Sequence, residues 1–416
     1  MDHERAETYL RQLAEAELRC GTRSTRFFEA VRALTAVGAL DTGLADAIGY
    51  DLELARRARQ QALQPGASRF SPPMPTRVRP MIRRPAQAAK ASPGTNLVAP
   101  VGLRIPVPHG DIRAEIFLLA YLWNASGARI AIHAWGTDDG DPGMWLSTEG
   151  LTVSDDSGHR YSLYFLGGGG GSEWNGELWF DPAPPADARW LNLILAAEPA
   201  RRISLERPAV QPAATMTGTV LTRGERYLHG VAHRLLCGDP PTHGIGAAVE
   251  ALLAAGALDA DSAVPGQLAA LCERLQFIDH GIHATPAAEL PGLWLSVLTG
   301  EQQASAGRAC AAIAVTLPEL DGNTITLLGL HDDGEQTVLH VHTTALGPDA
   351  SLMPRLSLLD HGGRWHLTDA DGWRWASGDP TSYLTVTPPL GRPARVEIIA
   401  SAQSAEVRVE APLQWS

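Results

Sequence analysis

The chain of 416 residues is 44% hydrophobic and only 19% charged, so it has enough apolar side chains for more than one folded domain. Its formal net charge of −12 argues against a general binder of nucleic acid or of acidic membranes, because such proteins present a basic face. Lys90 is the only lysine, which excludes nearly all lysine-dependent chemistry.

The N-terminal sequence MDHERAETYL has no apolar core of the kind that a signal peptide needs. No run approaches the roughly 18 apolar residues of a membrane span. The cysteines Cys20, Cys237, Cys272 and Cys310 have no C-x-x-C spacing and are expected to be reduced thiols. We therefore expect a cytoplasmic protein without a membrane span.

The first element, residues 1–64, is predicted to be a three-helix unit, because its apolar residues recur with helical spacing. Within it, the stretch AVRALTAVGALD from Ala30 to Asp41 should form a helix that ends at Gly38, since glycine tolerates a left-handed conformation. Asp41 is then in position to cap the third helix.

A linker is expected next, at residues 65–97, which are rich in proline and arginine and contain no acidic residue. Residues 98–208 then contain short apolar runs bounded by Gly, Pro, Asp and Asn clusters. Such spacing is typical of an immunoglobulin-like antiparallel β-sandwich, with SDDSG as one hairpin turn.

The second half repeats this order. AVEALLAAGALD, from Ala248 to Asp259, matches nine of the twelve letters found 218 residues earlier, and it predicts a helix end at Gly256 and a cap at Asp259. We expect an α+β, multidomain fold that consists of a tandem duplication of the three-helix unit followed by the immunoglobulin-like antiparallel β-sandwich. Its remaining parts are a linker at 209–222, a second helical unit at 223–280, a connecting segment at 281–307 and a second sandwich at 308–416.

Both strand-rich regions resemble the generic immunoglobulin-like sandwiches of bacterial proteins, in their turn spacing and in the proline-marked strands FDPAPP and VTPPLG. The resemblance covers about half of the chain and implies a sandwich fold. It implies no activity, because such folds serve many functions.

Two histidine groups have the spacing of metal ligands. His229, His233 and Cys237 lie four residues apart on a predicted helix, but Gly230 stands where a metalloprotease helix has its glutamate. At the corresponding positions of the first helix the residues are charged, which favours an ordinary solvated face.

His340 and His342 would lie on one side of a strand, with His331 and Asp332 across the hairpin, a set that zinc or copper could use. In the alternative interpretation Leu339 and Val341 point into the core while the histidines face water. The sequence does not decide whether either histidine group binds a metal. We assign no metal ligand, no cofactor and no catalytic residue.

The glycine run Gly167 to Gly171 leads into another strand and is followed by no lysine, so we expect a flexible hairpin or inter-strand loop and not a phosphate-binding loop. Tryptophans recur near this run and at the corresponding place in the second half. The candidate ligand-binding residues are Trp145, Trp174, Trp373 and Trp375. The alternative is that they cover the open end of a sandwich.

These features favour a non-catalytic binding or scaffold protein, in which two tandem helical-plus-sandwich modules engage a macromolecular partner, expected to be another protein and not nucleic acid. One alternative is a carbohydrate-binding protein that uses the tryptophans. The other is a metal-dependent enzyme that uses the histidines of the second half.

Overall fold

The computed structural model of the chain describes most of its helices and strands. The described residues are 2–20, 25–62, 97–109, 112–124, 127–135, 151–170, 173–185, 187–195, 200–205, 214–218, 221–238, 244–276, 289–300, 307–345, 354–369, 381–402 and 405–416. The predicted linker at 65–97 lies outside these ranges except for Leu97.

Two compact units make up the chain, and each combines stretches that are far apart in the sequence. One unit contains Met1–Gln87 and Val220–Leu298, and its described elements are helices. The other contains Ala88–Thr219 and Thr299–Ser416, and it holds two large antiparallel sheets. The protein is thus of mixed α and β type with a large β part, while helices and strands are segregated into separate units.

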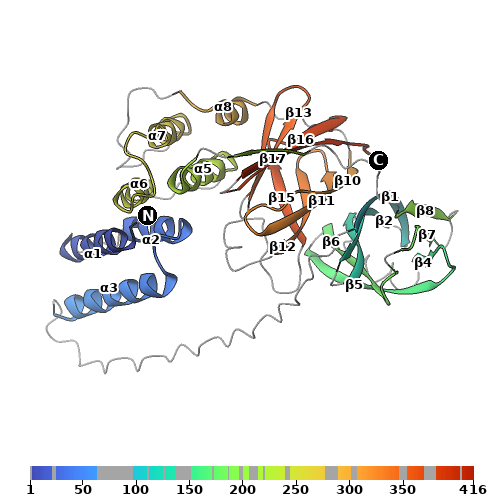
Figure 1. Cartoon of the computed structure of the whole chain (residues 1–416), viewed down its shortest axis with the longest axis horizontal. Helices are drawn as coiled ribbons and strands as arrows, with labels where there is room; N and C mark the ends of the chain where they lie inside the picture. Colours follow the sequence, from blue (N-terminus) through green and yellow to red (C-terminus); the bar gives the residue numbers. More distant parts are fainter. Residues whose placement is uncertain are drawn as a thin grey trace. The chain divides into compact units, whose positions relative to one another are not determined.

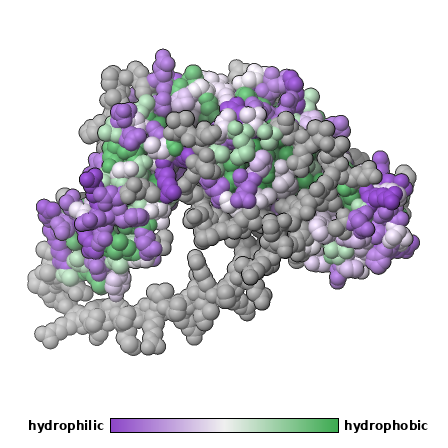
Figure 2. Space-filling view, in the orientation of Figure 1, coloured by the Kyte–Doolittle hydropathy of each residue, from purple (hydrophilic) through white to green (hydrophobic). Residues whose placement is uncertain are grey.

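The helical unit has one shared hydrophobic core. Its described helices are α1 (His3–Cys20), α2 (Thr25–Ala36), α3 (Thr42–Ala62), α5 (Arg223–Leu236), α6 (Ile245–Ala254), α7 (Val264–Arg274) and α8 (Gly292–Thr299) (Figure 1). Phe27 and Leu34 of α2 belong to the same buried cluster as Ile245 and Leu252 of α6. Hydrophilic residues cover much of the helix surface drawn in Figure 2, as expected for amphipathic helices. None of the helices in the described part of the chain is long and apolar enough to cross a membrane.

Both predicted helix ends at glycine are confirmed. Gly38 and Gly256 have φ angles of +71° and +60°, the left-handed conformation that glycine adopts without a Cβ penalty. The Leu34 carbonyl accepts hydrogen bonds from the backbone N–H groups of residues 39 and 40 at 2.8 and 3.2 Å. In the same way, the Leu252 carbonyl accepts from residues 257 and 258 at 2.9 and 3.3 Å.

The two predicted helix caps differ in outcome. Asp41 is confirmed, because its Oδ1 accepts hydrogen bonds from the backbone N–H groups of Gly43 at 2.8 Å and Leu44 at 3.3 Å. Asp259 is wrong as a cap, because α7 begins only at Val264, after Ala263, and has a proline in its first turn. Backbone N–H groups in the first turn of a helix have no partner within the helix, so proline, which lacks this group, is well tolerated there. The helix therefore begins near this proline and not at Asp259.

Each sheet of the other unit is antiparallel throughout. The first sheet contains β1 (Leu97–His109), β2 (Ile112–Asn124), β3 (Gly127–Trp135), β4 (Leu151–Asp155), β5 (Arg160–Gly170), β6 (Glu173–Asp181), β7 (Trp190–Leu195) and β8 (Arg201–Ser204). The second contains β10 (Ala309–Thr316), β11 (Asn323–Asp332), β12 (Thr337–Ala345), β13 (Arg355–Asp360), β14 (Trp365–Thr368), β15 (Thr381–Thr387), β16 (Arg395–Ser401), β17 (Ala405–Pro412) and β9 (Ala214–Gly218), the last of these within the predicted linker at 209–222.

The two sheets have the same strand order. In the first sheet it is β1-β2-β3-β6-β5-β4-β7-β8, and in the second it is β10-β11-β12-β15-β14-β13-β16-β17, with β9 added at the edge next to β17.

The predicted hairpin turn SDDSG is confirmed, since it joins β4 to β5, and LDHGG joins β13 to β14 in the same way. Asp155 Oδ1 accepts hydrogen bonds from the backbone N–H groups of residues 157 and 159 at 2.9 and 3.0 Å. Asp360 Oδ1 accepts from residues 362 and 364 at 2.7 and 2.9 Å. The same side-chain geometry therefore closes both turns.

The two sheets face each other through a buried layer, so the strands in that layer are covered on both sides. Ile130 and Ile132 of β3 point into the core of the first sheet, and Ala131 and Trp135 point to the opposite face. On that face they pack with Cys310 of β10 and Leu328 of β11, which belong to the second sheet. This two-sided burial explains why the sequence of β2 and β3 is apolar at nearly every position.

A buried histidine cluster as the candidate functional site

Strand alternation places three histidines in the layer between the sheets. Leu339 and Val341 of β12 point into the core of the second sheet, as predicted, so His340 and His342 lie on the other face. That face is covered by the first sheet, and both histidines are buried, with exposed fractions of 0 and 2%. The alternative in which these histidines face water is wrong, because sequence alternation identifies the face but not what covers it.

The cluster is formed by His133 of β3, His331 of β11 and His340 of β12. The rings of His133 and His331 are stacked, with centroids 3.6 Å apart and an interplanar angle of 9°. His331 Nδ1 lies 2.6 Å from His340 Nε2, a hydrogen bond between two imidazoles. One ring nitrogen from each histidine can be chosen so that all three lie within 4.8 Å of one another. Among the described residues, this is the only group of three or more His, Cys, Asp or Glu side chains with the spacing of metal ligands.

The neighbouring Asn175 of β6 determines the tautomer of His133. His133 Nδ1 lies 2.7 Å from the Asn175 Oδ1 atom, which can only accept, so Nδ1 carries the hydrogen and donates it. The lone pair of His133 is therefore on Nε2, which is buried and has no hydrogen-bond partner. His340 Nδ1 is also buried without a partner.

Burial keeps these imidazoles neutral. It lowers the pKa of His133 to about 4, although the hydrogen bond to Asn175 acts in the opposite direction. Burial, and then the neighbouring histidines, hold the pKa values of His331 and His340 well below the usual range. Neutral imidazole is the form that binds metal ions, because its free nitrogen has a lone pair.

Aromatic side chains surround the cluster. The Trp135 ring packs edge-on against His133 and His331, with centroids 4.4 and 5.6 Å away. The Tyr383 ring packs against His340 at 5.0 Å. All three histidines are at most 3% exposed, so the cluster is shielded from bulk water.

His342 does not join the cluster but forms a second polar group between the sheets. Arg129 of β3 lies 2.9 Å from one ring nitrogen of His342 and 3.1 Å from Glu177 Oε1 of β6. Glu177 also accepts a hydrogen bond from the Thr381 hydroxyl of β15. Arg129 and Glu177 are 1 and 3% exposed, so this is a buried ion pair that links the first sheet to two strands of the second.

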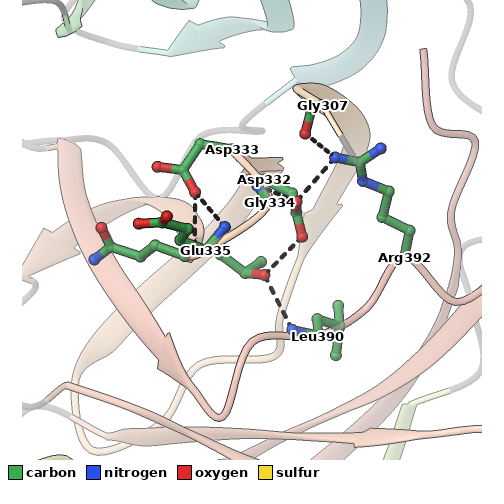
Figure 3. Close-up of polar contacts among 9 residues, drawn as sticks. Gly307, Asp332, Asp333, Gly334, Glu335, Leu390 and Arg392 are labelled. Carbon is green, nitrogen blue, oxygen red and sulfur yellow. Dashed lines mark hydrogen bonds and ion pairs between the residues drawn. The ribbon is translucent and has the colours of Figure 1, made fainter. Parts of the chain in front are cut away.

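Asp332, the predicted neighbour of His331 in a metal set, is directed away from the histidines. Its carboxylate pairs with Arg392 at 3.0 Å and accepts hydrogen bonds from the Gly334 N–H at 2.8 Å and the Thr337 hydroxyl at 3.1 Å (Figure 3). The Thr337 hydroxyl in turn accepts from the Leu390 N–H at 3.0 Å. These contacts join the β11–β12 turn to the segment after β15, and Asp332 is part of the framework of the second sheet.

The other sequence-based candidates are not brought together. His229 and His233 lie on α5 with ring centroids 6.4 Å apart, and His229 packs against Trp294 at 5.0 Å. Neither they nor Cys237 belong to a described group of three potential metal ligands. Of the described cysteines, Cys237, Cys272 and Cys310 form no disulfide.

The candidate tryptophans remain predictions. Trp145, Trp373 and Trp375 lie outside the described residues. Trp174 lies in β6, where its backbone pairs with Ala134 of β3 and Gly169 of β5, and its side chain lies outside the described part. The glycine run lies in a hairpin, one of the two structures expected for it, and Gly167 to Gly170 extend β5 and pair with β6.

His133 is the member of the cluster that the sequence analysis missed. The signal was the pattern RIAIHAW, in which His133 alternates with Ile130 and Ile132 and so must lie on the face opposite to the core. That pattern contains no information on which strands of the distant second sheet lie against it.

No family model matches the chain, and no curated protein is similar to it.

Proposed function

We propose that this chain is a non-catalytic binding or scaffold protein, built by tandem duplication of a helical unit and an immunoglobulin-like sandwich, with the second helical unit beginning at residue 223. The observation that carries the proposal is the equal strand order of the two sheets. A duplicated framework presents equivalent loops twice, and two linked sites raise binding strength through effective concentration.

Local geometry supports the duplication as well. The turns at Asp155 and Asp360 use the same hydrogen bonds, and the helix ends at Gly38 and Gly256 use the same carbonyl pattern. Two local features of this kind, in the same order along both halves, favour descent from one ancestral module over chance similarity.

A binding role, and not a catalytic one, is supported by the contacts of the buried polar groups in the described part of the chain. Arg129, Glu177 and His342 contact one another, and Asp332 is held by Arg392 and Thr337. These contacts stabilise the fold. The histidine cluster is at most 3% exposed, which favours a structural role for it over a catalytic one that needs substrate access.

The surfaces proposed for recognition are the connections from β5 to β6 and from β14 to β15. These connections occupy equivalent places in the two strand orders. Trp174 follows the first, while Trp373 and Trp375 belong to the second. We further propose that the partner is another protein in the cytoplasm, which the net charge of −12 and the unbridged thiols support.

The test is affinity capture from the native host with the full chain, followed by mass spectrometry. The triple variant W174A/W373A/W375A should lose a partner that the wild type retains, while its melting temperature stays within a few degrees. Trp190→Ala is the matched control, because Trp190 is a half-buried tryptophan of β7 that stacks with Arg202 at 4.6 Å. A partner that the triple variant captures equally well would contradict the proposed surface. Specific binding on a glycan array would favour carbohydrate recognition instead.

A further inference from the structure

We propose that His133, His331 and His340 bind one divalent transition-metal ion of the zinc class, with one ligand from the first sheet and two from the second. This goes beyond the proposed binding function and beyond the sequence analysis, which assigned no metal ligand. It rests on the donor set, on the unsatisfied ring nitrogens and on the distances between them.

The donor set selects the class of ion. Three neutral imidazoles suit zinc, copper, nickel and cobalt, whereas calcium and magnesium require oxygen ligands. The nearest carboxylate along the chain, Asp332, is held by Arg392 and Thr337 on the other side of β11. The site therefore offers nitrogen ligands.

Two ring nitrogens of the cluster are buried without a hydrogen-bond partner, His133 Nε2 and His340 Nδ1. Burying a polar atom without a partner is unfavourable, and an ion would provide one. A metal ion coordinated at His133 Nε2 would use the lone pair that no hydrogen-bond donor reaches.

The environment of His133 matches that of a metal ligand. Histidines that bind metal ions usually donate the hydrogen of their other nitrogen to a carbonyl or carboxylate oxygen, which fixes the ring. Asn175 Oδ1 accepts this hydrogen from His133 Nδ1 at 2.7 Å. The hydrogen bond thus fixes the ring of His133 and leaves Nε2 as the nitrogen that can bind an ion.

The imidazole rings must rotate to reach the ligand distances of a zinc site. Zinc–nitrogen bonds of about 2.0–2.1 Å in a tetrahedron place ligand nitrogens about 3.3 Å apart. The chosen nitrogens here lie within 4.8 Å of one another, and the closest contact, between His331 and His340, is 2.6 Å. Metal binding therefore replaces the hydrogen bond between His331 and His340, and rotations of the two rings adjust the remaining distances.

The expected role of the ion is to hold the sheets together. His133 lies on β3, and the other two ligands lie about 200 residues later on β11 and β12. An ion bound by all three would link the two sheets directly, and its binding free energy would add to the stability of the folded state.

The first experiment measures metal binding by the full chain, purified without a polyhistidine tag and stripped with a chelator. Zinc titrated against a chromophoric competitor should bind with a stoichiometry of one, and Co²⁺ should give the visible absorption bands of a tetrahedral nitrogen-ligated site. Zinc should also raise the melting temperature, whereas calcium and magnesium should leave it unchanged.

Variants then assign the ligands. H331Q and H340Q should each weaken zinc binding by at least 100-fold and abolish the thermal shift. Asn175→Ala is a milder variant that leaves the three ligands in place, and it should weaken binding by about 10- to 100-fold through loss of the ring orientation. H366Q is the matched control, because His366 is also buried in the second sheet and also donates its Nδ1 hydrogen to a carbonyl, that of Pro388 at 2.7 Å, but it belongs to no described group of three potential metal ligands.

The proposal is overturned if the wild-type chain binds less than a stoichiometric amount of zinc under these conditions. It is also overturned if H331Q or H340Q folds, as judged by circular dichroism, and binds zinc as tightly as H366Q. If both ligand variants fail to fold, the wild-type Co²⁺ spectrum and the Asn175→Ala affinity decide the question. An octahedral, oxygen-type spectrum, or an unchanged affinity of that variant, contradicts the site.

Discussion

Individual buried polar residues in the sheet unit limit the cost of a buried charge in two different ways. Arg129 and Glu177 retain their charges and pair with each other, whereas His133, His331 and His340 are kept neutral by burial. A buried ion pair compensates its desolvation only through close contacts, but a neutral imidazole avoids most of that cost. The neutral histidines therefore remain available as ligands.

Asp155 provides a residue-scale prediction. Burial acts to raise its pKa, but hydrogen bonds from Ser157, Tyr161 and His159 outweigh this effect and lower the pKa to about 2. Since this pKa is below the ordinary value of about 3.9, the ionised carboxylate stabilises the fold above about pH 4, and this stabilisation is lost as the pH falls toward 2. Asp155→Asn should therefore lower the free energy of unfolding by about 2 kcal/mol at pH 7 and by less at pH 3.

Urea denaturation of the variant at both pH values checks this prediction. Asp156→Asn is the matched control, because Asp156 is exposed and accepts one backbone hydrogen bond, from Arg189 at 3.2 Å. A loss of stability that is equal at pH 7 and pH 3 would contradict the role of the charge.

At the scale of elements, close approach decides where glycine is needed. Gly224 lies in the first turn of α5 against the corner that follows α6. A Cβ at this position would lie 2.6 Å from the Ala257 carbonyl oxygen and 2.9 Å from Leu258 Cβ. The backbone N–H of Gly224 also donates to that oxygen at 2.9 Å, so the helix cannot move away without losing the bond.

Gly224→Ala should therefore destabilise the helical unit by about 1–3 kcal/mol, the usual range for overpacking. Gly292→Ala, at the first residue of α8, should have little effect, because a Cβ there would meet nothing within 4 Å. Thermal unfolding followed by circular dichroism at 222 nm compares the two variants in the same unit. Equal melting temperatures would show that the corner can open.

For the whole molecule, both units depend on residues from both ends of the chain. Leu10, Phe27 and Leu34 share a core with Leu228 and Ile245. The N-terminal helices α1, α2 and α3 together have too little apolar surface to fold well alone. Contacts with the helices of the second half therefore provide a large part of their stability.

This arrangement predicts the behaviour of a cleaved chain. With a protease site inserted between residues 65 and 97, the N-terminal fragment should remain bound to the rest after cleavage and co-elute in native gel filtration. Leu34→Asp should release the fragment, because it puts a charge at a position that is 0% exposed. Elution of the wild-type fragment by itself would contradict the shared core.

Local structure could be predicted from the sequence wherever a short stretch contains its own hydrogen-bond partners. The helix ends at Gly38 and Gly256 and the turns at Asp155 and Asp360 are of this kind. The inward direction of Leu339 and Val341 followed from alternation. The start of α7 did not follow from Asp259, because a proline six residues later sets the first turn of that helix.

Short stretches of sequence were therefore enough to predict most helix ends and hairpin turns of this protein, and the face of a strand that each side chain occupies. The shared core of the helices from both halves, the packing of the two sheets against each other and the contact of His133 with His331 and His340 became known from the fold. Capping and alternation depend on neighbours a few residues away, whereas the cover of a sheet face depends on packing between segments about 200 residues apart, which no local pattern records.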